Sequence, residues 1–179
     1  MLVKELRYFI MKKEDSKKLG WKKDWSAIIY LILALIGFCV TAYDFWKLQD
    51  LSFNLNIFVV IGIVLICIGG AFRITSRMTL KKAGFDMINS YKLQIVSGQR
   101  LITTGVYSHI RHPLYLGEIS RNLGFAVLFS SFYGFIVLVV ANIFLIIRIQ
   151  TEEKMLVSEF GKDYEEYKKR TKKLLSYIY

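Results

Sequence analysis

The sequence predicts an all-α integral membrane protein with about four transmembrane helices, both termini in the cytoplasm, and an amphipathic cytoplasmic helix at its C-terminal end. Three observations support this fold class. Hydrophobic residues make up 54% of the 179 residues, they gather in long runs, and Lys and Arg concentrate in only some of the segments between those runs. The formal net charge of +11 does not indicate nucleic-acid binding, because the basic residues flank apolar runs. We expect the lipid bilayer as the partner and no nucleic acid.

Residues 1–24 form a basic segment that we place in the cytoplasm or at the membrane surface. It has eight Lys and Arg residues against four acidic ones. Apolar residues recur at helical spacing in its first dozen positions, so both an amphipathic interfacial helix and a frayed basic tail fit the pattern.

Residues 25–72 predict the first two transmembrane helices. The first span runs from Trp25 to Trp46, with tryptophan at each end as in an aromatic belt. The second runs from about Leu55 to Phe72, where two arginines follow the apolar run.

Two glycines and the two cysteines inside these spans bear on packing and on chemistry. Gly62 and Gly69 are seven residues apart and share one helix face, so they either pack closely against a neighbouring helix or simply face lipid. Cys39 and Cys67 have no CxxC or Cys/His spacing around them. We expect no disulfide, metal or nucleophile role for either cysteine.

Residues 73–113 form a long connection with seven basic residues and one acid. Loops of this length are uncommon without a function, and residues 97–100 could form the turn of a hairpin. Pro113, the only proline, suits the first position of a helix and pushes His112 into an extended conformation. The unpaired N–H groups of that helix end make it a candidate site for an anionic group.

Residues 114–149 are almost continuously apolar, and one straight helix over them would be about 54 Å long, which exceeds the bilayer. A break at residues 130–134, which contain two serines and a glycine, divides them into two spans of about 17 residues each. Positive charge then lies in the N-terminal flank, the 73–113 connection and the tail. Four spans with both termini in the cytoplasm satisfy this distribution.

Residues 150–179 predict the cytoplasmic helix, and the whole chain forms a single domain. An apolar and aromatic stripe recurs every three or four residues opposite a charged face; its members are Leu156, Phe160, Tyr164, Tyr167, Thr171 and Leu174. Gly161 within the stripe suggests a close contact or a kink.

The chemical candidates lie where the third span begins and the fourth span ends. Glu118 and Arg121 follow the proline by five and eight residues and form either a structural pair or a contact to substrate. Arg148 and Glu152 are four residues apart and share one helix face. They form either a surface ion pair or a site for one anionic and one cationic group. His112, from its sequence context alone, is more often structural than catalytic.

Several enzyme classes are disfavoured by what the sequence lacks. There is no Gly-rich dinucleotide loop, phosphate loop, serine nucleophile elbow or cluster with metal-ligand spacing. We therefore expect no Rossmann domain and no metal.

An ordered set of motifs runs through roughly residues 75–179. It comprises Leu101-Ile102-Thr103-Thr104-Gly105-Val106-Tyr107, Arg111-His112-Pro113-Leu114-Tyr115-Leu116-Gly117, Arg148, Glu152-Glu153, Phe160-Gly161-Lys162-Asp163-Tyr164 and Tyr167-Lys168-Lys169-Arg170-Thr171. This set resembles the isoprenylcysteine carboxyl methyltransferase family, part of a superfamily of integral membrane methyltransferases that includes phospholipid N-methyltransferases.

The resemblance implies a membrane methyltransferase that uses S-adenosylmethionine, with a cytoplasm-facing cofactor pocket and a lipophilic acceptor that arrives from the bilayer. The matching positions imply cofactor contacts from Gln99, Arg100, Leu101, Ile102, Tyr107, His112, Pro113, Leu114, Tyr115 and Glu152. They imply catalytic roles for Arg148 and Glu152. Arg148 would face the acceptor, and Glu118 and Arg121 are further candidates for substrate contacts.

The charges of the cofactor fit those roles. Glu152 can pair with its ammonium group, while His112 and the helix mouth receive its carboxylate. Arg148 can hold an acceptor carboxylate, which needs no general base; an amine acceptor would need one, with Glu118 or Glu152 as candidates.

The expected reaction is carboxyl O-methylation of an isoprenylcysteine-like substrate, and three alternatives stay open. One is phospholipid N-methylation. Another is an NADPH-dependent membrane reductase of the sterol-reductase type, which shares an Arg-His-Pro-x-Tyr-x-Gly stretch but usually has asparagine where this chain has Leu114. The third is a lipid-binding protein without enzymatic activity.

Overall fold

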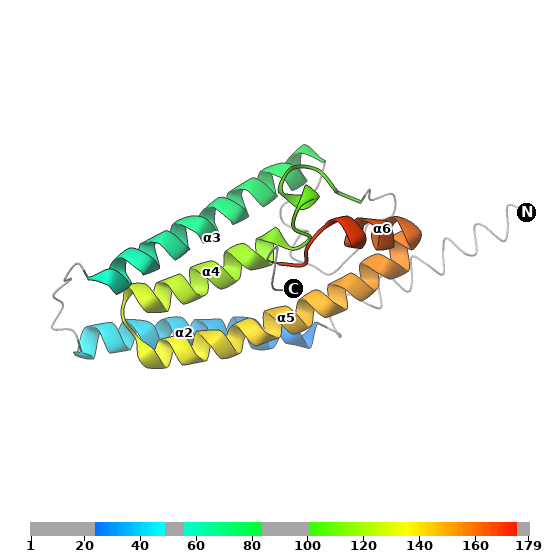
Figure 1. Ribbon diagram of the computed structural model, residues 1–179. Coiled ribbons are helices and arrows are strands. Elements are labelled where there is room, and N and C mark those ends of the chain that lie inside the picture. The colour runs from blue at the N-terminus through cyan, green and yellow to red at the C-terminus, as the bar shows by residue number, and fades with distance from the viewer. Residues whose placement is uncertain (1–23, 49–55, 84–100, 175–179) are drawn as a thin grey trace, which may run out of the picture.

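The computed structural model describes residues 24–48, 56–83 and 101–174 (Figure 1). Its elements are α2 (Trp25–Leu48), α3 (Ile57–Lys82), the 3-10 helix η2 (Gly105–Ser108), α4 (Pro113–Leu128), α5 (Phe132–Phe160) and α6 (Lys162–Arg170). Within these three ranges there is no named strand, only one isolated parallel bridge between Ile110 and Lys172, so the all-α prediction is confirmed for them. The expected interfacial helix near the N-terminus and the turn at residues 97–100 lie outside the described residues.

The four long helices form an elongated bundle with one polar end. In Figure 1, α2 lies along α5, and α4 lies between this pair and α3. The 3-10 helix η2 and helix α6 lie together at one end of the bundle, near the start of α4 and the end of α5. The start of α2 lies at this same end, because Asp24 forms an ion pair with Arg148 of α5.

Three helices, α2, α3 and α5, are long and apolar enough to cross a membrane. Their outer faces expose large apolar side chains such as Leu31 (64%) and Leu35 (65%), which suits contact with lipid tails. Helix α4 has 16 residues and is therefore about 24 Å long, less than the thickness of the hydrocarbon core. Three of the four expected spans are thus supported by length and composition. That α4 is the fourth span stays a prediction.

The expected ends of two apolar runs are not the ends of the helices. We expected the second span to stop at Phe72, but α3 continues to Lys82. We expected a new helix after Ile149, but α5 continues to Phe160. The reason is that Arg, Lys and Glu are good helix formers, so charged residues end an apolar run without ending the helix.

The predicted break in the long apolar region is confirmed. Helix α4 ends at Leu128 and α5 begins at Phe132. Ser131 caps α5, because its hydroxyl accepts a hydrogen bond from the Gly134 N–H at 3.0 Å. The same hydroxyl donates to Asp44 of α2 at 2.5 Å, so this turn is also tied to the neighbouring helix.

Glycines allow α3 and α4 to pack closely. Gly62 and Gly69 of α3 are buried, as are Gly117 and Gly124 of α4. A Cβ atom added to Gly69 would lie 2.6 Å from the Gly117 carbonyl oxygen, and one added to Gly117 would lie 2.7 Å from the Gly69 carbonyl oxygen. The two glycines of α3 therefore pack against a helix and do not face lipid.

The predicted inward packing of the C-terminal stripe is confirmed for half of its members: Tyr164, Tyr167 and Thr171 are buried, whereas Leu156, Phe160 and Leu174 are half-buried. Gly161 separates α5 from α6 and has a φ of 53°, a conformation that glycine adopts without strain. A Cβ atom at this position would meet no described atom within 4 Å. Of the two explanations for Gly161, the structure therefore supports the kink and not the close contact.

Candidate functional site

The motif at residues 111–117 places a histidine at the mouth of α4. Pro113 is the first residue of this helix, as predicted. His112 has φ −122° and ψ 57°; the φ agrees with the expected extended conformation, whereas the ψ is smaller than that of an extended chain. Two hydrogen bonds account for this conformation: the His112 N–H donates to the Lys173 carbonyl at 3.1 Å, and its own carbonyl accepts from the Leu116 N–H at 3.1 Å, which starts the helix.

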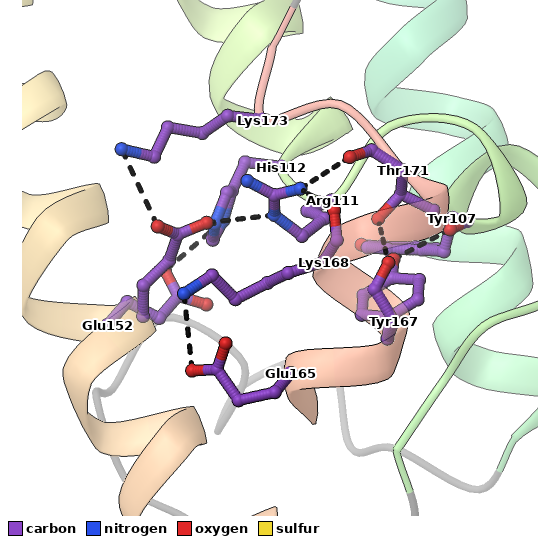
Figure 2. A network of polar contacts seen from close by, with 10 residues as sticks. Tyr107, Arg111, His112, Glu152, Glu165, Tyr167, Lys168, Thr171 and Lys173 are labelled. Atoms are coloured by element: carbon purple, nitrogen blue, oxygen red, sulfur yellow. Dashed lines mark hydrogen bonds and ion pairs between the residues drawn. The ribbon is translucent and has the colours of Figure 1, made fainter. Parts of the chain in front are cut away.

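The C-terminal segment is clamped onto the loop that precedes α4. The Lys172 N–H donates to the His109 carbonyl at 2.9 Å, and the Arg111 N–H donates to the Lys172 carbonyl at 2.8 Å. In α6, the Tyr167 hydroxyl donates to the Tyr107 carbonyl at 2.6 Å (Figure 2). These backbone contacts explain why the motifs at 101–117 and 160–171 occur together: each holds the other in place.

We call the contacts between residues 107–112 and residues 167–173 the clamp, and Glu153 of α5 lies at its centre. Its Oε1 accepts a hydrogen bond from Arg111 Nε at 2.9 Å and lies 3.3 Å from His112 Nε2. Its Oε2 lies 3.5 Å from Lys173 Nζ. Arg111 also donates from Nη1 to the Thr171 carbonyl at 2.5 Å. The carboxylate of Glu153 therefore joins α5 to the start of α4 and to the C-terminal segment.

Glu152 points to the other side of the His112 ring. Its Oε2 lies 3.9 Å from His112 Nδ1, is buried, and accepts no hydrogen bond from the described residues. The side chain as a whole is 30% exposed. Because a buried carboxylate oxygen without a donor is costly, Glu152 has the unmet capacity to accept a hydrogen bond from a ligand cation.

Arg148 lies on the same face of α5, one turn before Glu152. Its Nη2 is 2.9 Å from Asp24 Oδ2, and its guanidinium carbon is 6.0 Å from the centre of the Tyr115 ring. Asp24 also caps α2, because its Oδ1 accepts from the Ala27 N–H at 3.3 Å. The prediction of a face with one cation and one anion is thus extended by Asp24, which our sequence analysis missed.

Glu118 and Arg121 form an ion pair with each other. This is the first of the two roles that the sequence left open for them, a structural pair or a contact to substrate. Glu118 contacts both Arg121 and Arg73 of α3, and it accepts a hydrogen bond from the Tyr30 hydroxyl at 2.7 Å. Asn122 donates to the Tyr30 hydroxyl at 3.1 Å. This cluster lies one turn further along α4 than Tyr115 and ties α4 to both α2 and α3.

Three tyrosines around the clamp stay protonated. Burial raises the pKa of Tyr107, and the negative charge of Glu152 raises this pKa further. Burial raises the pKa of Tyr164, with a further contribution from the charge of Glu153. Burial also raises the pKa of Tyr167 to about 12, although Arg111 opposes the shift. These phenols therefore carry no charge at neutral pH, and the Tyr167 hydroxyl can donate to the Tyr107 carbonyl.

The remaining predicted contacts are distributed as follows. Pro113 is buried, and Leu101, Ile102 and Leu114 are half-buried. Gln99 and Arg100 lie outside the described residues. No group of three or more His, Cys, Asp and Glu side chains that could hold a metal ion occurs among the residues that the structure describes.

Three positions of the site were not assigned from the sequence as contacts: Asp24, Arg111 and Glu153. A signal existed for each. An acid directly before an apolar run is a helix-cap signal, and Arg111 and Glu153 both belong to the quoted motifs. What the sequence lacked was the direction of each side chain, since neighbouring residues on a helix differ by about 100°.

Comparisons with known proteins place these motifs in one family. The model of the isoprenylcysteine carboxyl methyltransferase (ICMT) family matches residues 52–158. A protein-S-isoprenylcysteine O-methyltransferase of Schizosaccharomyces pombe is 31% identical over 121 residues, which are 67% of this chain and 50% of the relative. That of Saccharomyces cerevisiae is 30% identical over 140 residues, which are 76% of this chain and 57% of the relative. A methanethiol S-methyltransferase of Bradyrhizobium diazoefficiens is 32% identical over 85 residues, 47% of this chain and 32% of the relative.

A solved structure supports the same assignment. The eukaryotic intramembrane Ras methyltransferase ICMT aligns with 83% of this chain and 52% of its own length, with a TM-score of 0.65 and 25% identity. This chain spans about half the length of the curated relatives that it matches. The family model covers more than half of this chain and includes α3, α4, most of α5 and the motifs at residues 101–117. The chain belongs to the isoprenylcysteine carboxyl methyltransferase family.

Proposed function

We propose that this chain is a membrane methyltransferase that uses S-adenosylmethionine to methylate the carboxylate of a prenylated cysteine or a similar lipophilic acid. The observation that carries this proposal is the Glu152 Oε2 atom, which is buried without a donor and lies 3.9 Å from His112 Nδ1. The names of the matched relatives support methyl transfer and a prenylated acceptor.

The residues present fit the cofactor. S-adenosylmethionine supplies an electrophilic methyl group on a sulfonium sulfur, together with an ammonium and a carboxylate that the protein can hold. Glu152 would hold the ammonium, because its Oε2 has no competing donor among the described residues. Glu153 is engaged by Arg111, His112 and Lys173, so it is less suited to this task.

The start of α4 would receive the carboxylate of the cofactor. The backbone N–H groups of a helix N-terminus favour an anion. The side chain of His112, the N-cap residue of α4, makes no hydrogen bond to these groups. The His112 ring lies between Glu152 and Glu153, and we therefore assign it to orienting Glu152. This differs from the sequence-based expectation that His112 itself receives the carboxylate.

Arg148 would hold the acceptor. Its guanidinium lies one helical turn from Glu152 on the same face of α5, and Asp24 shows that this position accepts a carboxylate at 2.9 Å. A carboxylate acceptor is already ionised at neutral pH and needs no general base, so orientation by Arg148 supplies the main contribution of the protein to the transfer. The apolar outer surfaces of α2, α3 and α5 suit delivery of the acceptor from the bilayer.

We also propose that α4 is the fourth span and that the polar end of the bundle faces the cytoplasm. The distribution of Lys and Arg supports both statements. The 16 residues of α4 are short for a span, but neighbouring helices cover one side of it through the glycine contacts, and local thinning of the bilayer accommodates a short helix at modest cost.

The test uses the purified full chain in detergent. S-adenosylhomocysteine should raise the unfolding temperature, and Glu152→Ala should abolish this shift. A shift with NADPH and none with S-adenosylhomocysteine would contradict the proposal and favour a reductase.

Transfer of a labelled methyl group identifies the acceptor chemistry. A prenylated cysteine with a free carboxylate should accept the label, whereas its carboxamide should not. The label should be released as methanol by mild base, because carboxyl methyl esters hydrolyse and N-methyl groups do not. A base-stable product in total lipid would point instead to phospholipid N-methylation.

A further inference from the structure

An open cavity lies on the face of α5 that points away from Arg148 and Glu152. Its volume is about 400 Å³, and it is lined by Gln150, Glu153, Lys154, Val157, Lys168 and Lys173. At 100° per residue, the lining positions of α5 lie about 170° around the helix from the Arg148–Glu152 face. The cavity is therefore distinct from the candidate methyl-transfer site.

The charge of the cavity favours an anion. Three lysines line it, against one acid. That acid, Glu153, already accepts from Arg111 and contacts His112 on its far side, so its charge is shared with groups outside the cavity. Lys168 pairs with Glu165 at 3.3 Å, and these side chains are 33% and 48% exposed. Such an exposed pair is weak, so Lys168 can turn to a ligand at little cost.

The position of the cavity selects the source of the anion. One end of it is Gln150, directly after the long apolar run of α5 that ends at Ile149, and Lys168 of α6 lines its other side. Where a membrane helix leaves the hydrocarbon core, the neighbouring layer contains the phosphates of the lipid headgroups. Val157 and the aliphatic stems of the lysines offer an apolar wall for the glycerol part of a lipid.

We propose that this cavity binds the phosphate of an anionic phospholipid, with Lys154 and Lys168 as its main ligands and Lys173 as a third. Lys173 also contacts Glu153 at 3.5 Å, so the lipid would lie next to the clamp that holds the start of α4. This proposal does not depend on the methyl-transfer reaction.

The test compares two double variants of the full chain in detergent that lose the same charge. In Lys154→Gln/Lys168→Gln two lysines of the cavity are neutralised, while the Lys168 carbonyl that accepts from Arg111 stays in place. In Lys162→Gln/Lys169→Gln two exposed lysines of α6 outside the cavity are neutralised. Short-chain phosphatidylglycerol, short-chain phosphatidylcholine and inorganic phosphate are titrated against each protein, and binding is followed by calorimetry.

We expect phosphatidylglycerol to bind the unmodified chain and phosphatidylcholine to bind much more weakly. The cavity variant should bind phosphatidylglycerol about tenfold more weakly or worse, since each basic residue near a membrane surface contributes about fivefold. The control variant should change binding by less than about twofold. An equal loss in both variants would overturn the proposal in favour of diffuse surface charge. Inorganic phosphate binding as tightly as phosphatidylglycerol would overturn the lipid as the source.

Discussion

Substitution by glutamine should have different effects at the adjacent residues Glu152 and Glu153: at Glu153 it should lower the stability of the protein, and at Glu152 it should weaken ligand binding. Glu153 is 13% exposed and contacts Arg111 and Lys173, which are themselves only 10% and 11% exposed. In Glu153→Gln the size is kept and the charge is lost. Hydrogen bonds to charged groups contribute about 1.5–3 kcal/mol and neutral ones about 1 kcal/mol. Two such contacts therefore give a loss of about 1–4 kcal/mol, and we take the middle of this range, about 2–3 kcal/mol, because both partners of each contact are largely buried.

Glu152→Gln should leave the free protein almost unchanged. Its Oε2 accepts no hydrogen bond from the described residues, and the side-chain oxygen of glutamine can still accept the hydrogen bond that links Glu152 to Tyr115, so we expect an effect within about 0.5 kcal/mol. Loss of a charge-assisted contact to a ligand ammonium should weaken S-adenosylhomocysteine binding by about tenfold or more. At a ligand concentration of 100 times the wild-type Kd, stabilisation should fall from about 2.7 kcal/mol to about 1.4 kcal/mol or less.

The assay is thermal unfolding in detergent, with and without S-adenosylhomocysteine. For a chain of this size 1 kcal/mol corresponds to about 2–4 °C, so Glu153→Gln should lower the Tm of the free protein by about 4–12 °C and Glu152→Gln by about 2 °C at most. The ligand should still stabilise Glu153→Gln. If Glu153→Gln removed the ligand response without lowering the Tm of the free protein, the assignment of the two residues would be reversed.

Three further predictions follow from single contacts. Gly69→Ala places a Cβ 2.6 Å from the Gly117 carbonyl and should destabilise the protein by about 1–3 kcal/mol; Gly70→Ala, whose Cβ meets no described atom within 4 Å, should be neutral or slightly stabilising in the same unfolding assay. Asp24→Asn removes the carboxylate from Arg148 and should lower the KM for a carboxylate acceptor, whereas an unchanged or raised KM would show that Arg148 does not hold it. Tyr167, with a pKa raised to about 12, contributes stability that is complete below pH 10 and is lost as the pH rises from about 10 to 12; in Tyr167→Phe this part of the alkaline loss of Tm should disappear.

The sequence predicted those features of the fold that depend on local patterns. Hydropathy located the helices, the proline marked the first residue of α4, and residues 130–134 marked the break before α5. Helices α3 and α5 extend beyond the ends of the predicted spans, because apolar runs mark contact with lipid while helices continue through charged residues. The spacing of Gly62 and Gly69 indicated a possible interface, but the partner helix required the structure.

The site was harder to predict, because its contacts join residues far apart in the sequence. The motif residues Arg111 and Glu153 are 42 positions apart, and the pairing of Asp24 with Arg148 links the start of the first described helix to the last long one. The periodicity of apolar residues along a helix gives no information about such long-range pairs. It does show that Arg148 and Glu152 share a face, which the structure places beside Tyr115 and His112.

The clamp and the site depend on each other through one geometric fact. Consecutive residues on a helix diverge by about 100°, so two neighbouring carboxylates can face opposite sides of one imidazole ring. On one side, Glu153 forms ion pairs with Arg111 and Lys173. The same carboxylate contacts His112 and so holds its ring at the start of α4. On the other side, Glu152 is left with an oxygen that has no donor among the described residues. The charge that stabilises the fold and the charge that we assign to the cofactor thus come from adjacent positions, and substitutions at the two should separate stability from ligand binding.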